Sequence, residues 1–453
     1  MNRRRILPVL LVLSSLACNY VMRAFGDTVS TPQAQAPAGL APVYIPPACK
    51  DVALATVPAA TALAVPTPIL RANPEVPLDV QKRVFDEAVR DVNDVYVYPD
   101  FNGQDWTQIT NKSRSRINSG LSTEDFYTEI ESMISALNDE HSHFESPVEV
   151  AASSAELAGT DEYVGIGVYI TSLIDKVRVS VISIFPDSPA EHSGLKPHDS
   201  LLAVDGIPIV QNGKERSEII LGVECSATIL TVQSPGESPR NVMLVRQRIH
   251  SSQTIETSLL PTKDGSRVAY ISLPTFFDEN IPGQVADALE KFGDLDGLIL
   301  DNRFNGGGSS DVFEPVLSYF ASGTLGQFVS RSDSRSLRIE PHPIHNSQTV
   351  PLVVLVGTDT VSFGEIFSGV MKDSGRAKIV GKTTLGNVEV LHGYSLDDGS
   401  RLWIAEETFV PAHSKENWEL TGIIPDVEAY ADWDTFTFET DPAIAAALKL
   451  LGH

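Results

Sequence analysis

Residues 350–369 read VPLVVLVGTDTVSFGEIFSG and combine an apolar run, a serine and a helical pattern. The run 350–357 predicts a buried strand, and the spacing of apolar residues after Ser362 predicts a helix. A strand that leads through a short turn into a helix is the repeating unit of an α/β sheet. The stretch therefore predicts an α/β layer with Ser362 at a strand-to-helix junction.

Two roles for Ser362 are compatible with this position. Serine is a preferred N-cap residue, and Glu365 three residues later completes an S-x-x-E capping box. A serine at a helix start also lies near backbone N–H groups that can stabilise an oxyanion, which suits a nucleophile. The choice depends on whether a base, an orienting acid and oxyanion donors exist elsewhere in the chain.

The alternation of strands and helices extends on both sides of this stretch. Apolar runs predict strands at 268–276, 295–303, 351–357 and 377–382, and amphipathic spacing predicts helices at 283–292, 311–321 and after Ser362. Ligands of such sheets bind outside the carboxyl ends of the strands. Two expected strand ends carry polar residues and glycines there, LILDNRFNGGGSS (298–310) and VVLVGTDTVSFGE (353–365).

The glycine run after Asn305 is a candidate oxyanion site. Without side chains, Gly307 and Gly308 let backbone N–H groups approach a bound group closely, together with the N–H of Phe363 after the serine. The run lacks the spacing of a phosphate-binding loop or a dinucleotide fingerprint. A purely structural tight turn remains the alternative.

Two further regions precede the α/β layer. In the region 77–150 the spacing is helical from 78 to about 137, with Val84, Val89, Val92 and Val95 on one stripe and a capping signal at Ser122. Between the two expected helices, 100–106 and 111–120 look loop-like or weakly helical. Residues 160–249 contain short β-type runs separated by turn signals. The chain therefore predicts a small helical region and a compact β-rich module.

The N-terminus has the features of an export signal. Residues 1–18 place a basic stretch before a short apolar segment and end at Cys18. Cleavage after Ala17, lipidation of Cys18 as in a bacterial lipoprotein, and retention as a signal anchor all remain open. Residues 19–76 are rich in Pro, Ala and Thr and predict an extended tether. We expect an extracytoplasmic protein that is either secreted or held at a membrane by this N-terminal anchor or lipid.

Charge and cysteine content exclude several classes of function. Acidic residues outnumber basic ones 59 to 34, and the net charge of −25 argues against nucleic acid as a partner. The 3 cysteines form no metal-ligand or redox motif, so no metal site is expected. Cys49 and Cys225 either pair in an oxidising compartment or remain free thiols.

Four segments together resemble the C-terminal processing peptidases, also called tail-specific proteases. LILDNRFNGGG resembles their DLRxNGGG strand end, DTVSFGE their nucleophile segment, RAKIVGKTTLGN (376–387) their GRAxxVGExTxG strand, and WELTGIIPD (418–426) their closing GIxPD. The resemblance implies a multi-domain α+β protein in which residues 250–440 form an α/β, ClpP/crotonase-like serine protease domain. It implies no cofactor.

The β-rich module resembles a PDZ domain. Gly165, Ile166, Gly167 and Val168 resemble the loop that binds a C-terminal carboxylate. Residues 187–206 resemble the segment before the central strand of a PDZ domain, and 217–222 resemble its second helix. Such a loop can hold the carboxylate while the peptide adds a strand to a sheet edge. The implied partners are proteins or peptides with free C-termini. A module that merely packs against the next domain is the alternative.

The general base is where the chain departs from most of this family. The processing peptidases use a lysine in TFGKG, but Asn387 stands at that position, and Lys372 and Lys382 do not match it. A histidine-using, tricorn-like branch has a DxHS/T segment and a glutamate in WExxGVxPD. His141 and Glu419 match those two positions.

The resemblance to that branch implies a Ser362–His141–Glu419 triad. His143 is the runner-up base. In the tricorn-like branch a serine before the histidine bridges to the glutamate, whereas Glu140 stands there in this chain, so the roles of Glu140 and Ser142 stay open.

These observations predict an exported serine endopeptidase that selects C-terminal tails and works through an acyl-enzyme. The alternative is a non-hydrolytic binder of peptides or lipophiles, because a fold does not guarantee its chemistry. The natural substrate, the oligomeric state, with a homo-oligomer open, and any control by the PDZ-like module do not follow from the sequence.

Overall fold

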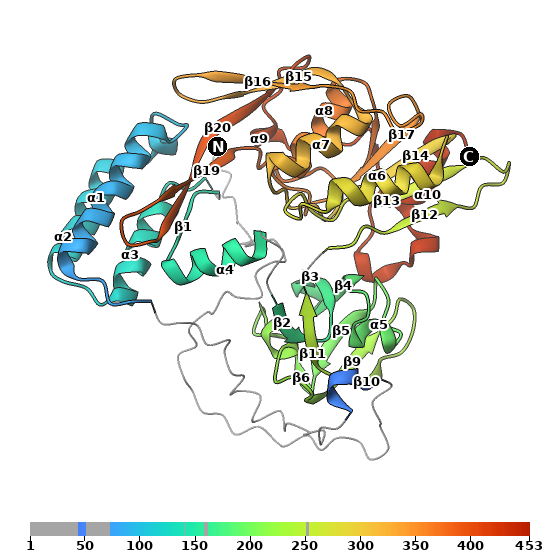
Figure 1. The fold of residues 1–453 in the computed structure, drawn as a ribbon, viewed down its shortest axis with the longest axis horizontal. Coiled ribbons are helices and arrows are strands. Elements are labelled where there is room, and N and C mark those ends of the chain that lie inside the picture. Colours follow the sequence, from blue (N-terminus) through green and yellow to red (C-terminus); the bar gives the residue numbers. More distant parts are fainter. Residues whose placement is uncertain (1–43, 51–72, 140, 158–161, 251–252) are drawn as a thin grey trace, which may run out of the picture. The chain divides into compact units, whose positions relative to one another are not determined.

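The computed structural model describes residues 44–50, 73–139, 141–157, 162–250 and 253–453. These residues form two compact units (Figure 1). The larger unit contains the described residues of 73–157, 253–430 and 442–453, and the β-rich unit contains 44–50, 162–250 and 431–441. The expected signal peptide and most of the expected tether lie outside the described residues. Within those residues, no helix has the length and apolar character needed to cross a membrane.

The larger unit is built on a mostly parallel sheet with the strand order β12-β13-β14-β17-β18-β21. Its strands are β12 (Thr257–Leu260), β13 (Val268–Ser272), β14 (Gly297–Asp301), β17 (Leu352–Val356), β18 (Lys378–Gly381) and β21 (Val427–Glu428). β12 runs antiparallel at the edge. β14 and β17 are buried at every position, as their unbroken apolar runs predict for parallel strands that are covered on both faces.

Helices alternate with these strands as the sequence predicts. They are α6 (Ile281–Phe292), α7 (Ser310–Phe320) and α8 (Phe363–Asp373), joined by the unpredicted C-terminal helix α10 (Pro442–Leu451). α6 packs on β13 and α7, α8 packs on α7 and β18, and α10 packs on β14, β17 and β18. Figure 1 shows α6 and α7 together beside the sheet. The buried core between these layers holds the turns after β14 and β17 in place.

A second sheet in the same unit was not predicted. It has the order β1-β20-β15-β16, with β19 paired to β20. Its strands are β1 (His143–Glu145), β15 (Gly323–Val329), β16 (Ser334–Ile339), β19 (Val390–Ser395) and β20 (Arg401–Pro411). Leu402, Ile404 and Ala405 of β20 lie in one apolar cluster with the N-terminal helices. The helical region and the α/β layer are therefore parts of one compact unit, which differs from the linear division expected from the sequence.

The N-terminal helices are α1 (Leu78–Val95), α2 (Trp106–Asn118), α3 (Thr123–Ser135) and α4 (Pro147–Leu157). Val84 and Val92 are fully buried, and Val89 and Val95 pack against the same cluster, so the predicted stripe is confirmed. The Ser122 hydroxyl accepts the N–H of Asp125, which confirms the predicted cap. The expectation of loops or weak helix at 100–106 and 111–120 was wrong where α2 lies, because the N-cap Asp105 and buried residues such as Trp106 and Ile117 stabilise a regular helix.

The β-rich unit contains a sheet of order β10-β9-β5-β4-β3, with β6 on β5. The strands and helix of this unit are β2 (Glu162–Gly165), β3 (Val168–Leu173), β4 (Arg178–Ile184), β5 (Ser200–Val204), β6 (Ile207–Pro208), β7 (Val210–Gln211), β8 (Lys214–Glu215), β9 (Ala227–Gln233), β10 (Arg240–Val245), β11 (Gln247–His250) and α5 (Pro189–His192). β2 pairs with β11, and β7 with β8, outside the main sheet. Residues 217–220, where the resemblance implies a second helix, form a short 3-10 helix. β3 ends the strand order of this sheet.

Two remote segments of the chain complete the β-rich unit. Cys49 and Cys225 form a disulfide, which settles the alternative left open by the sequence, and Tyr44 stacks on His192. The expected tether is therefore fixed to this unit around Cys49. At the other end, the indole N–H of Trp433 donates to the carbonyl of Val181 over 2.8 Å. Residues 431–441, expected in the protease domain, thus belong to the β-rich unit.

Candidate active site

The turns that follow β14 and β17 are joined by hydrogen bonds at the carboxyl ends of these strands. The buried side chain of Asn302 donates to the carbonyl of Gly364 over 2.7 Å and to the hydroxyl of Ser368 over 2.8 Å. The Asn305 carbonyl accepts the N–H of Val361 at 2.9 Å. A Cβ atom on Gly364 would lie 2.4 Å from that same carbonyl oxygen, so this close approach requires glycine. The two predicted strand ends therefore form one site.

Ser362 lies at the start of α8 in a strained backbone conformation, with φ 55° and ψ −125°. A non-glycine residue in such a sparsely populated region costs on the order of 1 to 3 kcal/mol, and such strain clusters at functional sites. The hydroxyl makes no capping hydrogen bond. The predicted capping box is thus wrong, because an N-cap serine normally has an extended backbone that directs its oxygen at the following N–H groups.

Gly307 packs directly against the serine. A Cβ atom on Gly307, at φ +94°, would lie 2.7 Å from the Cβ and 3.1 Å from the Oγ of Ser362, and 3.2 Å from the N of Phe363. The sequence-predicted residues Gly307, Ser362 and Phe363 therefore meet. The N–H of Gly307, however, donates to the Asn305 side chain over 2.9 Å, so this predicted oxyanion donor is already engaged.

Gly308 is held beside Phe276 with φ +147°. The N–H of Phe276 donates to the carbonyl of Gly307 at 2.7 Å, and the N–H of Ser309 donates to the carbonyl of Phe276 at 2.9 Å. This bridge uses the groups on either side of Gly308 and leaves the N–H of Gly308 outside it. Gly308 and Phe363 are thus the two predicted donors whose N–H groups remain suited to an oxyanion.

Glu365 is fully buried and has a role that the capping-box motif concealed. It accepts hydrogen bonds from the Thr384 hydroxyl, from the N–H of Gly386 at 2.9 Å and from the N–H of Asn387 at 2.7 Å. Burial raises the pKa of Glu365, against the three hydrogen bonds that favour its anion. The carbonyl of Asn387 accepts the N–H of Ser362 at 2.9 Å. Glu365 therefore holds segment 384–387 against the backbone of the serine.

His141 faces Glu389, a residue that the sequence analysis did not select. Its Nδ1 lies 3.4 Å from the Glu389 Oε2, and the two side chains are 11% and 2% exposed. The contact is longer than a well-formed hydrogen bond, and both atoms are buried without another partner among the described residues. Catalytic hydrogen bonds are often long before substrate binds. The sequence offered one indication of Glu389, its position two residues after Asn387 in the segment where related peptidases keep their lysine.

Glu419, the acid expected beside His141, lies next to Glu389 instead. Its Oε2 accepts the N–H of Val388 at 2.8 Å. Burial and then the charge of Glu389 raise the pKa of Glu419 to about 9, which favours its protonated form at neutral pH. Although burial opposes it, the pKa of Glu389 is lowered by His141, by Tyr98 and by its hydrogen bond with Glu419. These opposite shifts favour one negative charge on the pair, on the carboxylate that faces His141.

The other residues of segment 139–143 have separate contacts. The Ser142 hydroxyl donates to Asp139 over 2.6 Å and accepts the N–H of Ala405 at 3.0 Å, which ties this turn to β20. His143 bonds through Nδ1 to the carbonyl of His141 at 2.9 Å and stacks on Trp403. Glu140 lies outside the described residues. These contacts give Ser142 and His143 structural partners.

The two lysines considered as alternative bases are engaged away from the serine. Lys372 lies at the far end of α8, ten residues or about 15 Å along the helix axis from Ser362. Its ammonium donates to the carbonyl of Ile424 over 2.6 Å. Lys382 lies over the ring of Tyr430, 4.5 Å from its centroid. Neither contact brings a lysine to the position that a Ser–Lys pair needs.

In the β-rich unit, the predicted carboxylate loop is a tight turn between β2 and β3. Ile166 is fully buried and its carbonyl accepts the N–H of Ala190 at 2.9 Å. Gly167 has φ +80°, and a Cβ atom there would lie 2.2 Å from the Cβ of Ser188. Gly165 ends β2, and Val168 begins β3 at the end of the sheet. The turn is therefore packed rigidly.

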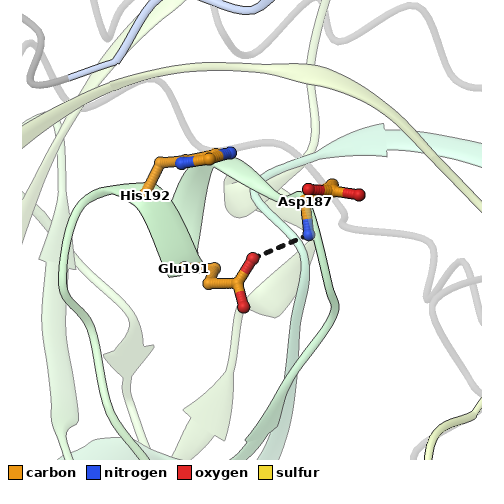
Figure 2. A group of neighbouring side chains, drawn as sticks. All are labelled: Asp187, Glu191 and His192. Carbon is orange, nitrogen blue, oxygen red and sulfur yellow. Dashed lines mark hydrogen bonds between the residues drawn. The ribbon is translucent and has the colours of Figure 1, made fainter.

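An exposed group on the same unit contains Asp187, Glu191 and His192, with ligand atoms within 4.8 Å of one another (Figure 2). The Glu191 carboxylate accepts the N–H of Asp187 at 2.7 Å, and the His192 ring stacks on Tyr44. These contacts account for the arrangement without an ion, and we assign no metal to it.

Comparison with known proteins agrees with this geometry. Residues 267–429 match peptidase family S41, and residues 81–135 match the tricorn protease C1 domain. The carboxyl-terminal-processing protease of Picosynechococcus sp. is 30% identical over 377 residues, covering 81% of this chain and 88% of that protein. The protein of the same name from Synechocystis sp. is 28% identical over 389 residues, covering 82% and 87%.

Solved structures show the same architecture. The photosystem II D1 C-terminal processing protease superimposes with a TM-score of 0.56 at 25% identity, covering 80% of this chain and 98% of that one. A putative S41 protease from Bacteroides fragilis, at 16% identity, shares the fold with a TM-score of 0.55 over 81% and 97% of the two chains. The predicted fold class and family resemblance are thereby confirmed. The chain is a serine-type peptidase that belongs to family S41.

Proposed function

We propose that this peptidase is an exported endopeptidase that uses Ser362 as nucleophile and His141 as general base. The observation that carries the proposal is the path of segment 384–389. Its Asn387 carbonyl accepts the Ser362 N–H, and two residues later Glu389 faces His141. One short stretch of chain thus contacts both residues, which lie far apart in sequence.

The chemistry follows from these groups. Because Nδ1 of His141 faces a carboxylate, Nε2 is the nitrogen that takes the proton as the Ser362 oxygen bonds to the scissile carbonyl carbon. The N–H groups of Gly308 and Phe363 stabilise the oxyanion. The imidazolium then gives its proton to the leaving amine, and water releases the acyl group by the same steps. Glu419, the third member implied by the resemblance, acts on His141 indirectly, through Glu389.

A covalent probe tests the nucleophile. We expect a fluorophosphonate to label the wild-type protein and Ser374→Ala, which removes a hydroxyl at the other end of the same helix. Ser362→Ala should not be labelled. Labelling that persists in folded Ser362→Ala would overturn the assignment of the nucleophile. A folded wild-type protein that neither reacts nor cleaves casein would instead favour a non-hydrolytic binder.

We propose that the β-rich unit acts as a PDZ domain that selects free C-termini. Two of the relatives described above are named carboxyl-terminal-processing proteases. In this chain a rigid turn with Gly167 at φ +80° leads into β3, which ends its sheet and can accept an added strand. Hydrogen bonds to a carboxylate are worth about 1.5 to 3 kcal/mol.

The corresponding test compares one peptide as a free acid and as its C-terminal amide. We expect the amide to have a KM at least tenfold higher, and the difference to shrink in Gly167→Ala. Gly194→Ala is the matched control, because Gly194 has φ +74° in the same unit with open space around it. Equal KM values for acid and amide would overturn the proposed selection but leave the catalytic proposal intact.

Export is supported by the disulfide between Cys49 and Cys225, since disulfides persist in oxidising compartments. The N-terminal signal ends at Cys18, whose lipidation would add a membrane anchor. Intact-mass analysis of the native protein distinguishes the three N-terminal forms. A chain that starts at Cys18 with a diacyl-sized addition is the lipoprotein, one without it is secreted, and an uncleaved chain is a signal anchor.

A further inference from the structure

We propose that Glu389 is the carboxylate that orients His141 and stabilises its imidazolium form, and that Glu419 supports Glu389 by holding a proton against it. This inference rests on the proposed roles of Ser362 and His141. It moves the orienting role from Glu419, where the sequence resemblance implies it, to a residue on the segment that also contacts the serine.

The two oxygens of Glu389 have different partners. Oε2 lies 3.4 Å from Nδ1 of His141, and Oε1 accepts the hydroxyl of Tyr98 over 2.7 Å. Tyr98 follows the end of α1, so the helical region holds the Glu389 oxygen that does not face the imidazole. With Oε1 fixed by Tyr98, Oε2 is directed at His141.

Glu419 lies beside Glu389. Its Oε2 accepts the N–H of Val388, the residue before Glu389, at 2.8 Å, and the two carboxyl groups lie close enough to shift each other's pKa. Two carboxylates that share a buried site cannot both ionise at low cost, so one of them keeps a proton. The histidine favours ionised Glu389, and the raised pKa of Glu419 agrees with the proton residing there. Glu419 can then donate that proton as a hydrogen bond to Glu389.

The proton inventory of the reaction is simple under this arrangement. The Ser362 proton moves to Nε2 of His141 and leaves with the amine, while the Nδ1 proton remains between His141 and Glu389. Glu389 stays ionised and Glu419 stays protonated throughout. The charge of Glu389 therefore stabilises the imidazolium that forms in the transition state, and Glu389 is a positioning residue rather than a proton acceptor.

Three glutamine substitutions in the full-length mature protein separate this role from a structural one. The readout is the second-order rate of labelling by a fluorophosphonate. We expect Glu389→Gln to lower this rate by about 10² or more, because it removes the charge and keeps the shape. Glu419→Gln should lower the labelling rate by less than a tenth of the factor seen for Glu389→Gln, because glutamine resembles a neutral carboxyl group. Glu407→Gln is the matched control, since Glu407 is also a buried glutamate beside a histidine, with His392 Nε2 at 3.2 Å, and should keep the wild-type rate.

A second readout does not depend on activity. In carbon-13 histidine-labelled protein, the imidazole signal of His141 is identified by its loss in His141→Gln, and its titration is followed by NMR. We expect this titration to move to lower pH in Glu389→Gln and to stay in place in Glu407→Gln. A residue that only supported the fold would not shift it selectively. If Glu389→Gln does not fold, Tyr98→Phe replaces it, and we expect a several-fold slower labelling rate and a downward shift of the same titration.

The outcomes distinguish this inference from the function on which it rests. Folded His141→Ala with wild-type labelling would refute the proposed base and this inference together. Loss of labelling in His141→Ala combined with an unchanged rate and titration in Glu389→Gln, or in Tyr98→Phe where it is used, would refute the inference alone. So would a larger loss in Glu419→Gln than in Glu389→Gln, which would return the orienting role to Glu419.

Discussion

The backbone N–H of Ser362 donates a hydrogen bond to the carbonyl oxygen of Asn387 over 2.9 Å. Asn387 stands where the sequence resemblance places the catalytic lysine of processing peptidases. In this chain the same position supports the serine through the main chain, and an asparagine side chain offers no general base. The proposed mechanism therefore assigns the proton to a group from another part of the fold, His141 beside Glu389.

We expect His141→Ala to lower kcat by on the order of 10³ or more, because removal of a triad base costs about that much. His143→Ala is the matched control, since it removes the neighbouring imidazole whose contacts are with the His141 carbonyl and Trp403. It should keep most of the activity, as should Lys372→Ala and Lys382→Ala. Steady-state kinetics with a quenched fluorescent peptide decide the matter. A lysine variant that is inactive while His141→Ala turns over normally would mean a displaced Ser–Lys mechanism.

Substitution of Gly307 tests how closely the glycine turn fits the serine. A methyl group in Gly307→Ala would lie 2.7 Å from the Ser362 Cβ and 3.2 Å from the N of Phe363, so it must displace the proposed nucleophile or the proposed oxyanion donor. We expect kcat to fall at least 10²-fold, the scale of losing one oxyanion donor. Gly323→Ala has the same φ of +94° with open space around it. Its stability should fall similarly and its kcat should stay near wild type; equal kcat losses would show that backbone strain alone is responsible.

Glu365 provides a prediction for stability as well as activity. Glu365→Ala leaves the N–H groups of Gly386 and Asn387 and the hydroxyl of Thr384 without their shared acceptor. Each unsatisfied buried polar group costs about 1 to 3 kcal/mol, so with three such groups we expect a loss of about 3 kcal/mol or more by urea denaturation, together with reduced activity. The exposed Glu340→Ala serves as control. A loss below about 1 kcal/mol would show that water readily replaces the carboxylate.

The sequence predicted the parts of this site that depend on local pattern. Unbroken apolar runs marked β14 and β17, and the rule that ligands lie at carboxyl strand ends brought Gly307 and Ser362 together. Glu365 was misassigned as part of a capping box because the S-x-x-E pattern does not reveal that Ser362 adopts φ 55°. Nor does it reveal that the Glu365 side chain accepts hydrogen bonds from segment 384–387.

Glu389 could not be found from spacing alone. Its relation to His141 depends on the second sheet, in which β1 and β19 both pair with β20 and so bring residues 143 and 390 into one layer. This pairing joins segments about 250 residues apart and has no local signal in the sequence. The helical region was therefore expected as a separate domain, although its core is shared with β20.

The disulfide between Cys49 and Cys225 joins residues separated by 176 positions. Cross-links that close long loops restrict the unfolded chain strongly, and removal of a native disulfide typically costs about 2 to 5 kcal/mol. We expect Cys225→Ser, or treatment with dithiothreitol, to lower the melting temperature of the β-rich unit while fluorophosphonate labelling of Ser362 persists. Calorimetry with and without reductant measures this. Unchanged melting would show that the packing of residues 44–50 holds this segment without the bond.

Glu419 predicts how stability depends on pH. Its pKa in the folded protein is raised to about 9, well above the ordinary glutamate value of 4.5. The folded state therefore binds this proton more tightly than the unfolded state, and the resulting stabilisation declines as the pH rises from about 5 to about 9. Glutamine at this position carries no titrating proton, so Glu419→Gln should remove this part of the pH dependence. We expect the free energy of unfolding of Glu419→Gln, relative to wild type, to rise by about 2 kcal/mol or more between pH 5.5 and pH 9. Urea denaturation at the two pH values measures the difference, with Glu407→Gln as control. A constant difference at both pH values would mean that Glu419 is ionised in the folded protein at neutral pH, and that the Glu389 pair carries two charges.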